Sequence, residues 1–286
     1  ALSGIAISKD GKYIAYGISQ SGSDWQEWRI KNIDTGEHLP DVLQWIKFYI
    51  PTWKKDSQGL FYSRYEQPKE GKLKETNYLH KVYYHSLGKS QDNDVLIYEK
   101  PDRKEWSFNC YITEDSKYLI ITVWQSTDRK NLVFYQDLTI PDAPIVELIS
   151  EFEAVYSLID NDNNIFWFVT DFDAPKRRVI AIDINNPPSP SLVKGDNQDK
   201  WQEIIPEATY ALQGVGTLNN QFVAFYLKDA HTQIKIFNLD GSPVRDVELP
   251  GIGSVGGFYG RRYDTTTFYS YVTVSYTHLT LPTSYA

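Results

Sequence analysis

The amino-acid sequence predicts an all-β chain folded as a β-propeller, with about five complete blades and one partial blade. Aromatic residues make up 15% of the 286 residues, and such large flat side chains favour half-buried strands. A unit of apolar strand, polar turn and apolar strand recurs along the chain, which indicates an architecture built from repeats. No stretch combines helical periodicity with capping residues at both ends.

The repeat is marked by polar hairpin turns, each lying between two apolar runs. Asp, Asn and Gly readily adopt the backbone conformations of tight turns. Neighbouring turns are 45 to 59 residues apart, close to the ~40–50 residues of a four-stranded propeller blade. A β-sandwich would show evenly spaced single strands in place of this longer period. The six turns are centred on Asp10, Asp56, Asp115, Asp162, Asn219 and Asp264.

Each turn is expected to join two strands, and in the complete units a further strand follows. Two polar segments, residues 66–77 and 185–198, are expected to be loops within or between blades. The strand cores should include Ile14, Tyr16, Phe61, Leu119, Ile121, Phe166, Phe168, Val223 and Phe225. The expected strands are, unit by unit, Gly4–Ser8, Tyr13–Tyr16 and Trp28–Ile33; Pro51–Trp53, Leu60–Ser63 and Lys81–Gly88; Cys110–Ile112, Tyr118–Ile121 and Leu132–Leu138; Tyr156–Leu158, Ile165–Phe168 and Val179–Asp183; Gly214–Gly216, Phe222–Tyr226 and Ile234–Leu239; and Ser254–Gly256 with Thr267–Tyr271.

The composition restricts the compartment and the partners. The 29 basic and 37 acidic residues give a net charge of −8, which argues against binding to nucleic acid or to an anionic membrane. No apolar run approaches the ~20 residues of a membrane-spanning helix, and no leader-like segment opens the chain. Cys110 is the single cysteine, so no internal disulfide can form, and we expect a reducing, cytoplasmic location. We expect Cys110 to be a small buried hydrophobe.

The sequence contains no recognisable catalytic or metal-binding motif. Nucleophilic hydrolysis needs an exposed serine with a base within reach, but there is no G-x-S-x-G, and Gly251–Gly256 has the wrong spacing. None of the five histidines is paired with a serine in a known motif, and metal-ligand spacing is absent. Residues 160–164 lack the glycine and distal glutamate of a calcium loop, so a hairpin turn is expected. We therefore predict no catalytic residue, metal or cofactor within this chain.

Three motifs in the first hundred residues resemble one family. Tyr16–Trp25 contains a Tyr-Gly-Ile-Ser run and then Ser-Gly-Ser-Asp-Trp, Leu39–Leu43 is followed by Ile-Lys-Phe and Trp53, and Asn77–Gly88 contains Leu-His-Lys-Val-Tyr-Tyr-His. In this order the motifs are similar to those of prolyl oligopeptidase propellers. The resemblance extends more weakly to Gly253–Gly256 and covers residues 1–273.

The resemblance implies a seven-bladed propeller that caps an α/β-hydrolase domain with a Ser-Asp-His triad and cleaves short peptides after proline. The catalytic domain would lie outside this chain, so we expect the chain alone to be inactive. The implied partners are that domain and short proline-containing peptides, with a monomeric enzyme. Two other hypotheses stay open: a stand-alone propeller that binds proteins through its loops, and a sister oligopeptidase with another specificity.

Two site residues follow from the same resemblance. Phe48 matches a propeller aromatic that faces the substrate pocket, although a strand residue in the core is the other interpretation. Asp24 matches an acid that pairs with a basic residue of the hydrolase domain, although it could instead stabilise a turn. Trp124 stands where some members of the family have an arginine near the domain interface, so the electrostatics of that region differ.

The last residues, 274–286, are expected not to be natural protein sequence. Val274–Thr283 resembles the translation of a sequencing-library adapter, and the family resemblance stops at this boundary. A divergent strand is the other interpretation, because Val274, Tyr276 and His278 alternate acceptably. We therefore expect residues 1–273 to be a truncated propeller domain and residues 274–286 to be a non-native tail.

Overall fold

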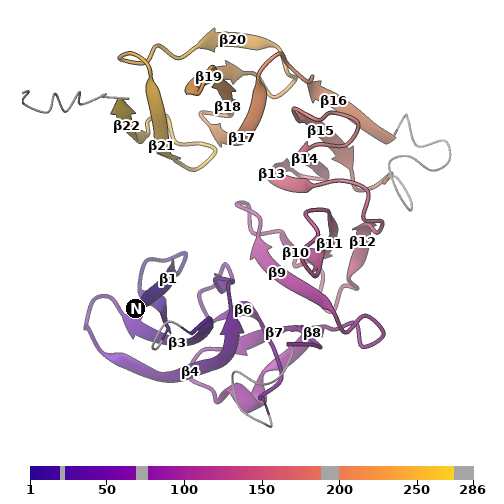
Figure 1. The fold of residues 1–286 in the computed structure, drawn as a ribbon. Helices are drawn as coiled ribbons and strands as arrows, with labels where there is room; N and C mark the ends of the chain where they lie inside the picture. Colours follow the sequence, from indigo (N-terminus) through magenta and orange to yellow (C-terminus); the bar gives the residue numbers. More distant parts are fainter. Residues whose placement is uncertain (20–22, 69–76, 188–199, 274–286) are drawn as a thin grey trace, which may run out of the picture. The chain divides into compact units, whose positions relative to one another are not determined.

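The computed structural model describes residues 1–19, 23–68, 77–187 and 200–273 (Figure 1). Apart from one short 3-10 turn, η1 (Gln91–Asn93), every regular element in these ranges is a β-strand. The tail at 274–286 and most of the two expected loops lie outside the described residues. By contacts the described residues divide into two compact units: those within 1–156, 161–165 and 182–201, and those within 157–160, 166–181 and 202–273.

The described strands form five four-stranded antiparallel sheets and one two-stranded sheet, in sequence order. This confirms the predicted propeller architecture of five complete blades and one partial blade. The first three sheets are β1 (Leu2–Ile7), β2 (Tyr13–Ser19), β3 (Trp25–Asn32) and β4 (His38–Lys47); β5 (Thr52–Trp53), β6 (Gly59–Arg64), β7 (Lys81–Ser86) and β8 (Val95–Tyr98); and β9 (Trp106–Ile112), β10 (Tyr118–Gln125), β11 (Asn131–Asp137) and β12 (Val146–Ile149).

The other three sheets follow the same plan as far as the chain continues. The last of them contains only two strands among the described residues. Their strands are β13 (Tyr156–Asp162), β14 (Ile165–Thr170), β15 (Arg178–Asp183) and β16 (Trp201–Ile205); β17 (Ala211–Leu218), β18 (Gln221–Lys228), β19 (His231–Phe237) and β20 (Pro243–Asp246); and β21 (Gly253–Tyr259) with β22 (Phe268–Thr273).

The first hairpin of each complete sheet turns through a residue in the left-handed backbone region. This region disfavours most side chains but accepts Gly and Asn readily, which is why the polar turn signal in the sequence located these hairpins correctly. These residues are Gly11 (φ 75°), Ser57 (57°), Ser116 (64°), Asn163 (51°), and, in the fifth sheet, both Asn219 (49°) and Asn220 (54°).

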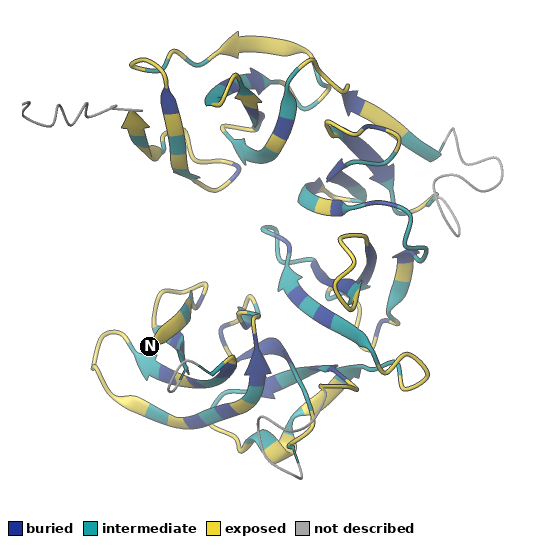
Figure 2. Ribbon diagram, viewed as in Figure 1, coloured by how far each residue is buried: buried dark blue, intermediate teal, exposed yellow. Residues whose placement is uncertain are grey.

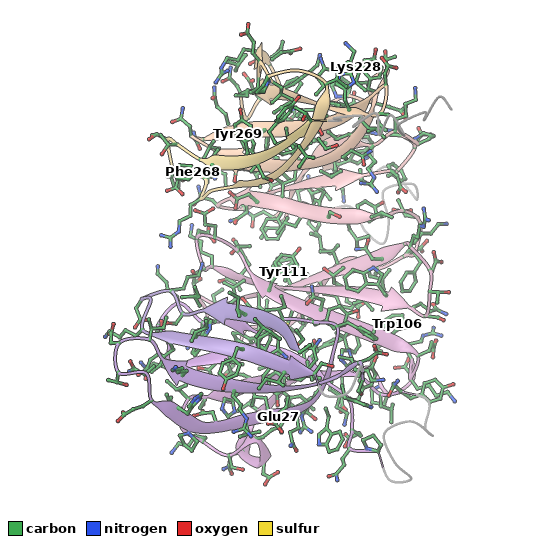
Figure 3. The ribbon with its side chains drawn as sticks, turned by 60° about the vertical axis from the view of Figure 1, so that its left-hand side comes forward. Glu27, Trp106, Tyr111, Lys228, Phe268 and Tyr269 are labelled. Carbon is green, nitrogen blue, oxygen red and sulfur yellow. The ribbon has the colours of Figure 1, made fainter. Side chains whose placement is uncertain are left out.

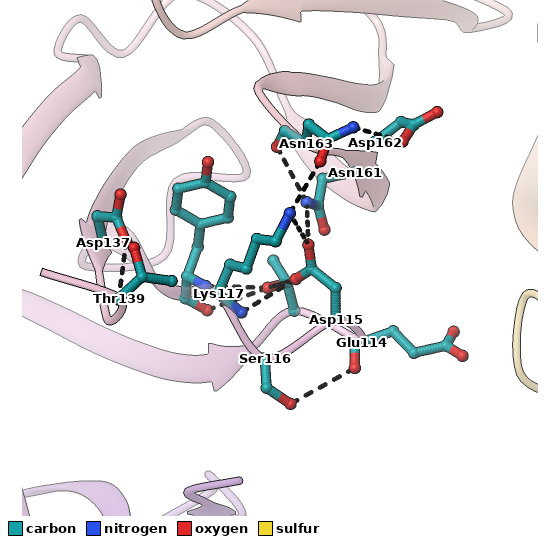
Figure 4. Close-up of polar contacts among 11 residues, drawn as sticks. Glu114, Asp115, Ser116, Lys117, Asp137, Thr139, Asn161, Asp162 and Asn163 are labelled. Atoms are coloured by element: carbon teal, nitrogen blue, oxygen red, sulfur yellow. Dashed lines mark hydrogen bonds and ion pairs between the residues drawn. The ribbon is translucent and has the colours of Figure 1, made fainter.

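The turn of the third sheet shows how side chains fix this geometry (Figure 4). The hydroxyl of Thr113 donates to Asp115 Oδ1 at 2.7 Å, and the same oxygen accepts the N–H of Lys117 at 3.0 Å. The other carboxylate oxygen of Asp115 accepts the side-chain amide of Asn161 at 2.9 Å. Lys117 Nζ also reaches Asn163 Oδ1 at 2.8 Å. The turn acid therefore both closes its own hairpin and ties the third sheet to the next one.

Most buried residues lie within strands, whereas many of the turns are exposed (Figure 2). One cluster lies between the first and second sheets and includes Trp28, Leu43 and Leu60; another, between the second and third, includes Phe108 and Phe134. Burial of each such side chain contributes on the order of 2 kcal/mol.

Most residues predicted for the strand cores are buried, and three are only half-buried. Phe61, Leu119, Ile121, Phe166, Phe168 and Val223 are 0–4% exposed. Ile14, Tyr16 and Phe225 are of intermediate exposure. For β2 the reason is alternation: Ala15 and Gly17 occupy the buried face, so their neighbours Ile14 and Tyr16 lie on the opposite face.

Candidate functional site

Asp24 and Phe48 lie side by side at one end of the first sheet. Trp25, the first residue of β3, pairs with Lys47, the last residue of β4. Asp24 directly precedes Trp25 and Phe48 directly follows Lys47, so antiparallel pairing brings together two residues that are far apart in the sequence. The structure thus places both predicted site residues on one edge of the first blade.

Phe48 is held outside the strand in an unfavourable backbone conformation. Its φ angle is 64°, and the N–H of Tyr49 donates to the carbonyl of Lys47 at 2.8 Å. Together these features define a γ-turn of the rarer form, centred on Phe48. A bulky residue with positive φ costs about 1–3 kcal/mol and persists only where its surroundings enforce it. The side chain is 65% exposed, so Phe48 does not lie in the core.

Phe48 forms one wall of a shallow pocket of about 430 Å³. Asn109, Cys110 and Tyr111 of β9 also line the pocket; Tyr111 is labelled in Figure 3. Ile50 adds a second exposed apolar side chain, at 48%. The described lining contains no charged residue: it comprises Phe48, Tyr49, Ile50, Pro51, Thr52, Asn109, Cys110 and Tyr111.

A layer of aromatic rings supports this end of the sheets. Tyr49 stacks on Trp124 with ring centroids 6.0 Å apart and planes at 16°. Burial raises the pKa of Tyr49, so its hydroxyl stays protonated. His80 accepts the N–H of Phe108 on Nδ1 at 2.9 Å, and burial lowers the pKa of His80 to about 3. His80 is therefore neutral, and the layer beneath Phe48 carries no charge from either ring.

Asp24 shares its surroundings with a largely buried lysine. Lys47 is 8% exposed, and its Nζ lies 4.2 Å from the centroid of the Trp25 ring. Burial lowers the pKa of Lys47, while the charge of Asp24 opposes that shift. The N–H of Trp25 donates to the hydroxyl of Ser23 at 3.1 Å. The exposed Asp24 carboxylate therefore faces a cation of its own sheet.

No described histidine is hydrogen-bonded to a serine, threonine or cysteine side chain. His38 contacts the hydroxyl of Tyr16 at 3.2 Å, and His80 contacts a backbone N–H. His85 lies between two carboxylates, and His231 is 3.4 Å from a backbone carbonyl. Among the described residues no group of three or more His, Cys, Asp or Glu side chains is arranged to hold a metal ion, and no helix is long and apolar enough to cross a membrane.

The sequence interpretation missed the buried cluster around His85. In the sequence, His85 is part of the Asn77–Gly88 motif and Asp41 is part of the Leu39–Leu43 motif, and neither motif indicates a contact between the two residues. The available signal was a histidine on an apolar strand, because such a residue needs hydrogen-bond partners once it is buried.

Four-stranded antiparallel sheets that follow one another along a chain are the blades of a β-propeller, and they define the class of this protein. Residues 1–278 match the family described as "Prolyl oligopeptidase, N-terminal beta-propeller domain", and the chain belongs to this family. This confirms the family resemblance inferred from the three sequence motifs.

Curated relatives and solved structures agree with this assignment. The chain is 32% identical over 272 residues to the prolyl endopeptidase of Elizabethkingia meningoseptica, covering 95% of this chain and 37% of that protein. The prolyl endopeptidase of Dictyostelium discoideum is 27% identical over 323 residues, with 99% and 42% covered. The chain thus spans well under half the length of these relatives.

Among solved structures, one from a study of two prolyl endopeptidases, on inter-domain dynamics in catalysis and specificity, matches with a TM-score of 0.84 at 30% identity. The match covers 95% of this chain and 37% of that one. Prolyl oligopeptidase B from Galerina marginata shares the fold, with a TM-score of 0.80 at 24% identity, covering 95% of this chain and 38% of that one.

Proposed function

We propose that this chain is the propeller part of a proline-specific serine oligopeptidase that cleaves short peptides. The observation that carries the proposal is the family match over residues 1–278, together with relatives named prolyl endopeptidases. The catalytic hydrolase domain would lie outside this chain. The propeller would then admit flexible peptides and exclude folded proteins, and the chain by itself would be inactive.

Phe48 is proposed to contact the substrate peptide. Its high exposure and its enforced γ-turn support this role, because strained backbone concentrates at functional sites. The uncharged lining around it suits an apolar, proline-containing segment, since a buried charge would have to be desolvated without compensation. Asp24 is proposed to pair with a basic residue of the hydrolase domain. Its position beside Phe48 would place this contact at the edge of the substrate path.

The domain boundaries are part of the proposal. Residues 1–273 would be the truncated propeller domain, and residues 274–286 a non-native tail; the family match ends five residues inside that tail. We also propose a monomeric, cytoplasmic enzyme. Sequencing the source locus tests the truncation: a frame that continues after Thr273 into a G-x-S-x-G segment supports it, and an uninterrupted frame through Ala286 contradicts the tail assignment.

Two measurements on the purified chain test the functional proposal. First, the chain is expected not to hydrolyse a proline-linked chromogenic peptide above the buffer background. Second, titration of the ¹⁵N-labelled chain with a short proline-containing peptide is expected to shift amide signals around Phe48. The variant Phe48→Ala should lose these shifts, whereas Ile140→Ala, which truncates another exposed apolar side chain (57%) in the connection between β11 and β12, should keep them.

Three results would count against the proposal. Hydrolysis that co-purifies with the chain would contradict the absence of a catalytic site. Equal peptide-induced shifts in Phe48→Ala and in the wild type would remove Phe48 from the binding surface. Shifts confined to loops away from Phe48 would favour the alternative of a propeller that binds partners through its loop ends.

A further inference from the structure

A second cluster of polar side chains is fully buried between the first and second sheets. His85, on β7, is 0% exposed. Its Nε2 lies 2.8 Å from Asp41 Oδ1, and its Nδ1 lies 2.7 Å from Asp94 Oδ1. Both carboxylates are themselves at most 1% exposed at the side chain. Buried carboxylates of this kind are retained only when they are paired and hydrogen-bonded.

The donors around Asp94 fix the role of one of its oxygens. Gln91 Nε2 donates to the hydroxyl oxygen of Tyr62 at 2.8 Å. Tyr62 must therefore direct its own O–H toward Asp94 Oδ2, which lies 2.6 Å away. One oxygen of Asp94 thus accepts from Tyr62 and the other faces His85. If Asp94 is charged, Oδ1 can only accept from Nδ1 of His85, because a carboxylate carries no proton to donate.

Asp41 also acts as an acceptor. Its Oδ1 receives the N–H of Gly88 at 2.6 Å in addition to the contact with His85. A charged carboxylate can only accept, so between two charged carboxylates each ring nitrogen of His85 must donate. A neutral imidazole has a single N–H and can satisfy only one of the two contacts. We therefore infer that the ring is an imidazolium between two carboxylates, with a net charge of −1 on the three groups together.

The cluster joins two different blades. Asp41 belongs to β4, the outermost strand of the first sheet, whereas His85 and Asp94 belong to the second sheet and its connection. Gln91, on the same connection, exchanges two hydrogen bonds with the backbone of Gln44 on β4, at 3.1 and 3.2 Å. The outer strand of the first blade is therefore bound to the second blade at two points. His85 and Gly88 contact Asp41, and the Gln91 amide contacts the backbone of Gln44.

We propose that His85 is a cationic latch between the first and second blades, and that the attachment of β4 depends on the second proton of its ring. When that proton is lost, one ring nitrogen of His85 and the carboxylate oxygen beside it are both acceptors, with no hydrogen between them. The negative charges of the two buried carboxylates then have no positive charge next to them. The packing of the first blade against the second is therefore stable at neutral pH and weakens at alkaline pH.

The electrostatics agree in direction with this geometry. Burial disfavours the charged ring, but the hydrogen bonds and charges of Asp41 and Asp94 outweigh burial and raise the pKa of His85 to about 9. The folded-state value is thus above the ordinary 6.5, so the stabilisation is fully present below about pH 6.5 and is lost as the pH rises through about 9. Burial and the charge of Asp94 raise the pKa of Tyr62, so Tyr62 remains a donor throughout, with Arg64 the nearby cation.

The ring nitrogens of His85 give a direct test in the full chain. In ¹⁵N-labelled protein, both nitrogens are expected to show protonated-type chemical shifts at pH 7. The titration midpoint should correspond to ~300-fold tighter proton binding than a free histidine, since each pKa unit is a factor of ten. The variant Asp41→Asn should weaken proton binding by about tenfold or more, because the amide keeps an acceptor oxygen but loses the charge.

Urea unfolding at pH 7.5 and pH 10, followed by tryptophan fluorescence, gives a second readout. The wild type and the control His231→Gln, which alters a histidine outside the cluster, should both lose stability at pH 10. The variant His85→Gln should be less stable at pH 7.5 but lose less on going to pH 10. A neutral His85 ring at pH 7, or a titration midpoint at or below that of a free histidine, would overturn the proposal without any variant. An alkaline loss of the same size in His85→Gln would also overturn it.

Discussion

Asn131 offers the sharpest test of how neighbouring blades are joined. It is the first residue of β11 and is 1% exposed. Its side-chain oxygen accepts the N–H of Tyr156 at 2.8 Å, and its Nδ2 donates to the carbonyl of Tyr156 at 3.0 Å and to that of Leu132 at 3.2 Å. The side-chain amide of Asn131 therefore pairs with the backbone of Tyr156 as a neighbouring strand would, and it connects the third sheet to the start of the fourth.

The expected cost of Asn131→Ala follows from these bonds. Three hydrogen bonds are lost, and each contributes about 0.5–1.5 kcal/mol net. The free energy of unfolding should therefore fall by about 1.5–4.5 kcal/mol. Asn131→Asp should be at least as destabilising, because it places a carboxylate oxygen against the carbonyl of Tyr156 and buries a charge.

Urea unfolding followed by tryptophan fluorescence measures both variants. The matched control is Asn238→Ala, which removes an exposed amide whose Nδ2 donates to Ser242 Oγ in a surface turn at 2.9 Å. Exposed substitutions change stability by about 0.5 kcal/mol or less. If Asn131→Ala and Asn238→Ala cost the same within 0.5 kcal/mol, the inferred role of the buried amide is refuted. A carboxylate variant as stable as the wild type would refute the assigned orientation of the amide.

Two further predictions concern packing and reactivity. Gly17→Ala should destabilise the chain by about 1–3 kcal/mol, because the new Cβ would lie 2.7 Å from Cε2 of the buried Trp28. The control Gly214→Ala should cost clearly less, since a Cβ at that position has nothing within 4 Å. Equal losses of stability in urea unfolding would contradict this prediction. Cys110 is 2% exposed and burial raises its pKa to about 12, so it should react with a thiol reagent at pH 8 only after unfolding in urea, and a native rate equal to the unfolded rate would contradict its burial.

The blade plan could be predicted because its determinants are local. Asp10 and Asp115 each close a hairpin within five residues of chain, through a hydroxyl two positions earlier and an N–H two positions later. Such Asx-type contacts depend on neighbouring residues alone. The sequence therefore located each hairpin, and the spacing of the hairpins indicated the number of blades.

The half-buried strand residues were harder to predict because burial depends on which face meets a neighbour. Ile14 and Tyr16 read as core residues by their character, yet Ala15 and Gly17 occupy the packed face. Gly17 is small because the indole of Trp28 lies against it. A small residue at such a position gives little sign of burial in the sequence, although it marks where another part of the chain comes closest to the strand.

The site residues depended on features that no local pattern contains. The pairing of β3 with β4 is shifted twice by irregularities, between Gln26 and Trp28 and between Arg29 and Lys31. Bulges of this kind re-aim side chains along a strand, so simple alternation along β3 and β4 does not predict which face each residue occupies. The contact of His85 with Asp41 joins residues from two sheets, so it exists only after the blades have packed.

The first sheet also limits how strongly Asp24 could hold a second domain. Lys47 already lies near the Asp24 carboxylate and is itself buried against Trp25. A basic residue of the proposed hydrolase domain would therefore share Asp24 with Lys47. Because Asp24 is exposed, such a pair is worth about 0–1 kcal/mol. An attraction of this size would hold the two domains together only weakly.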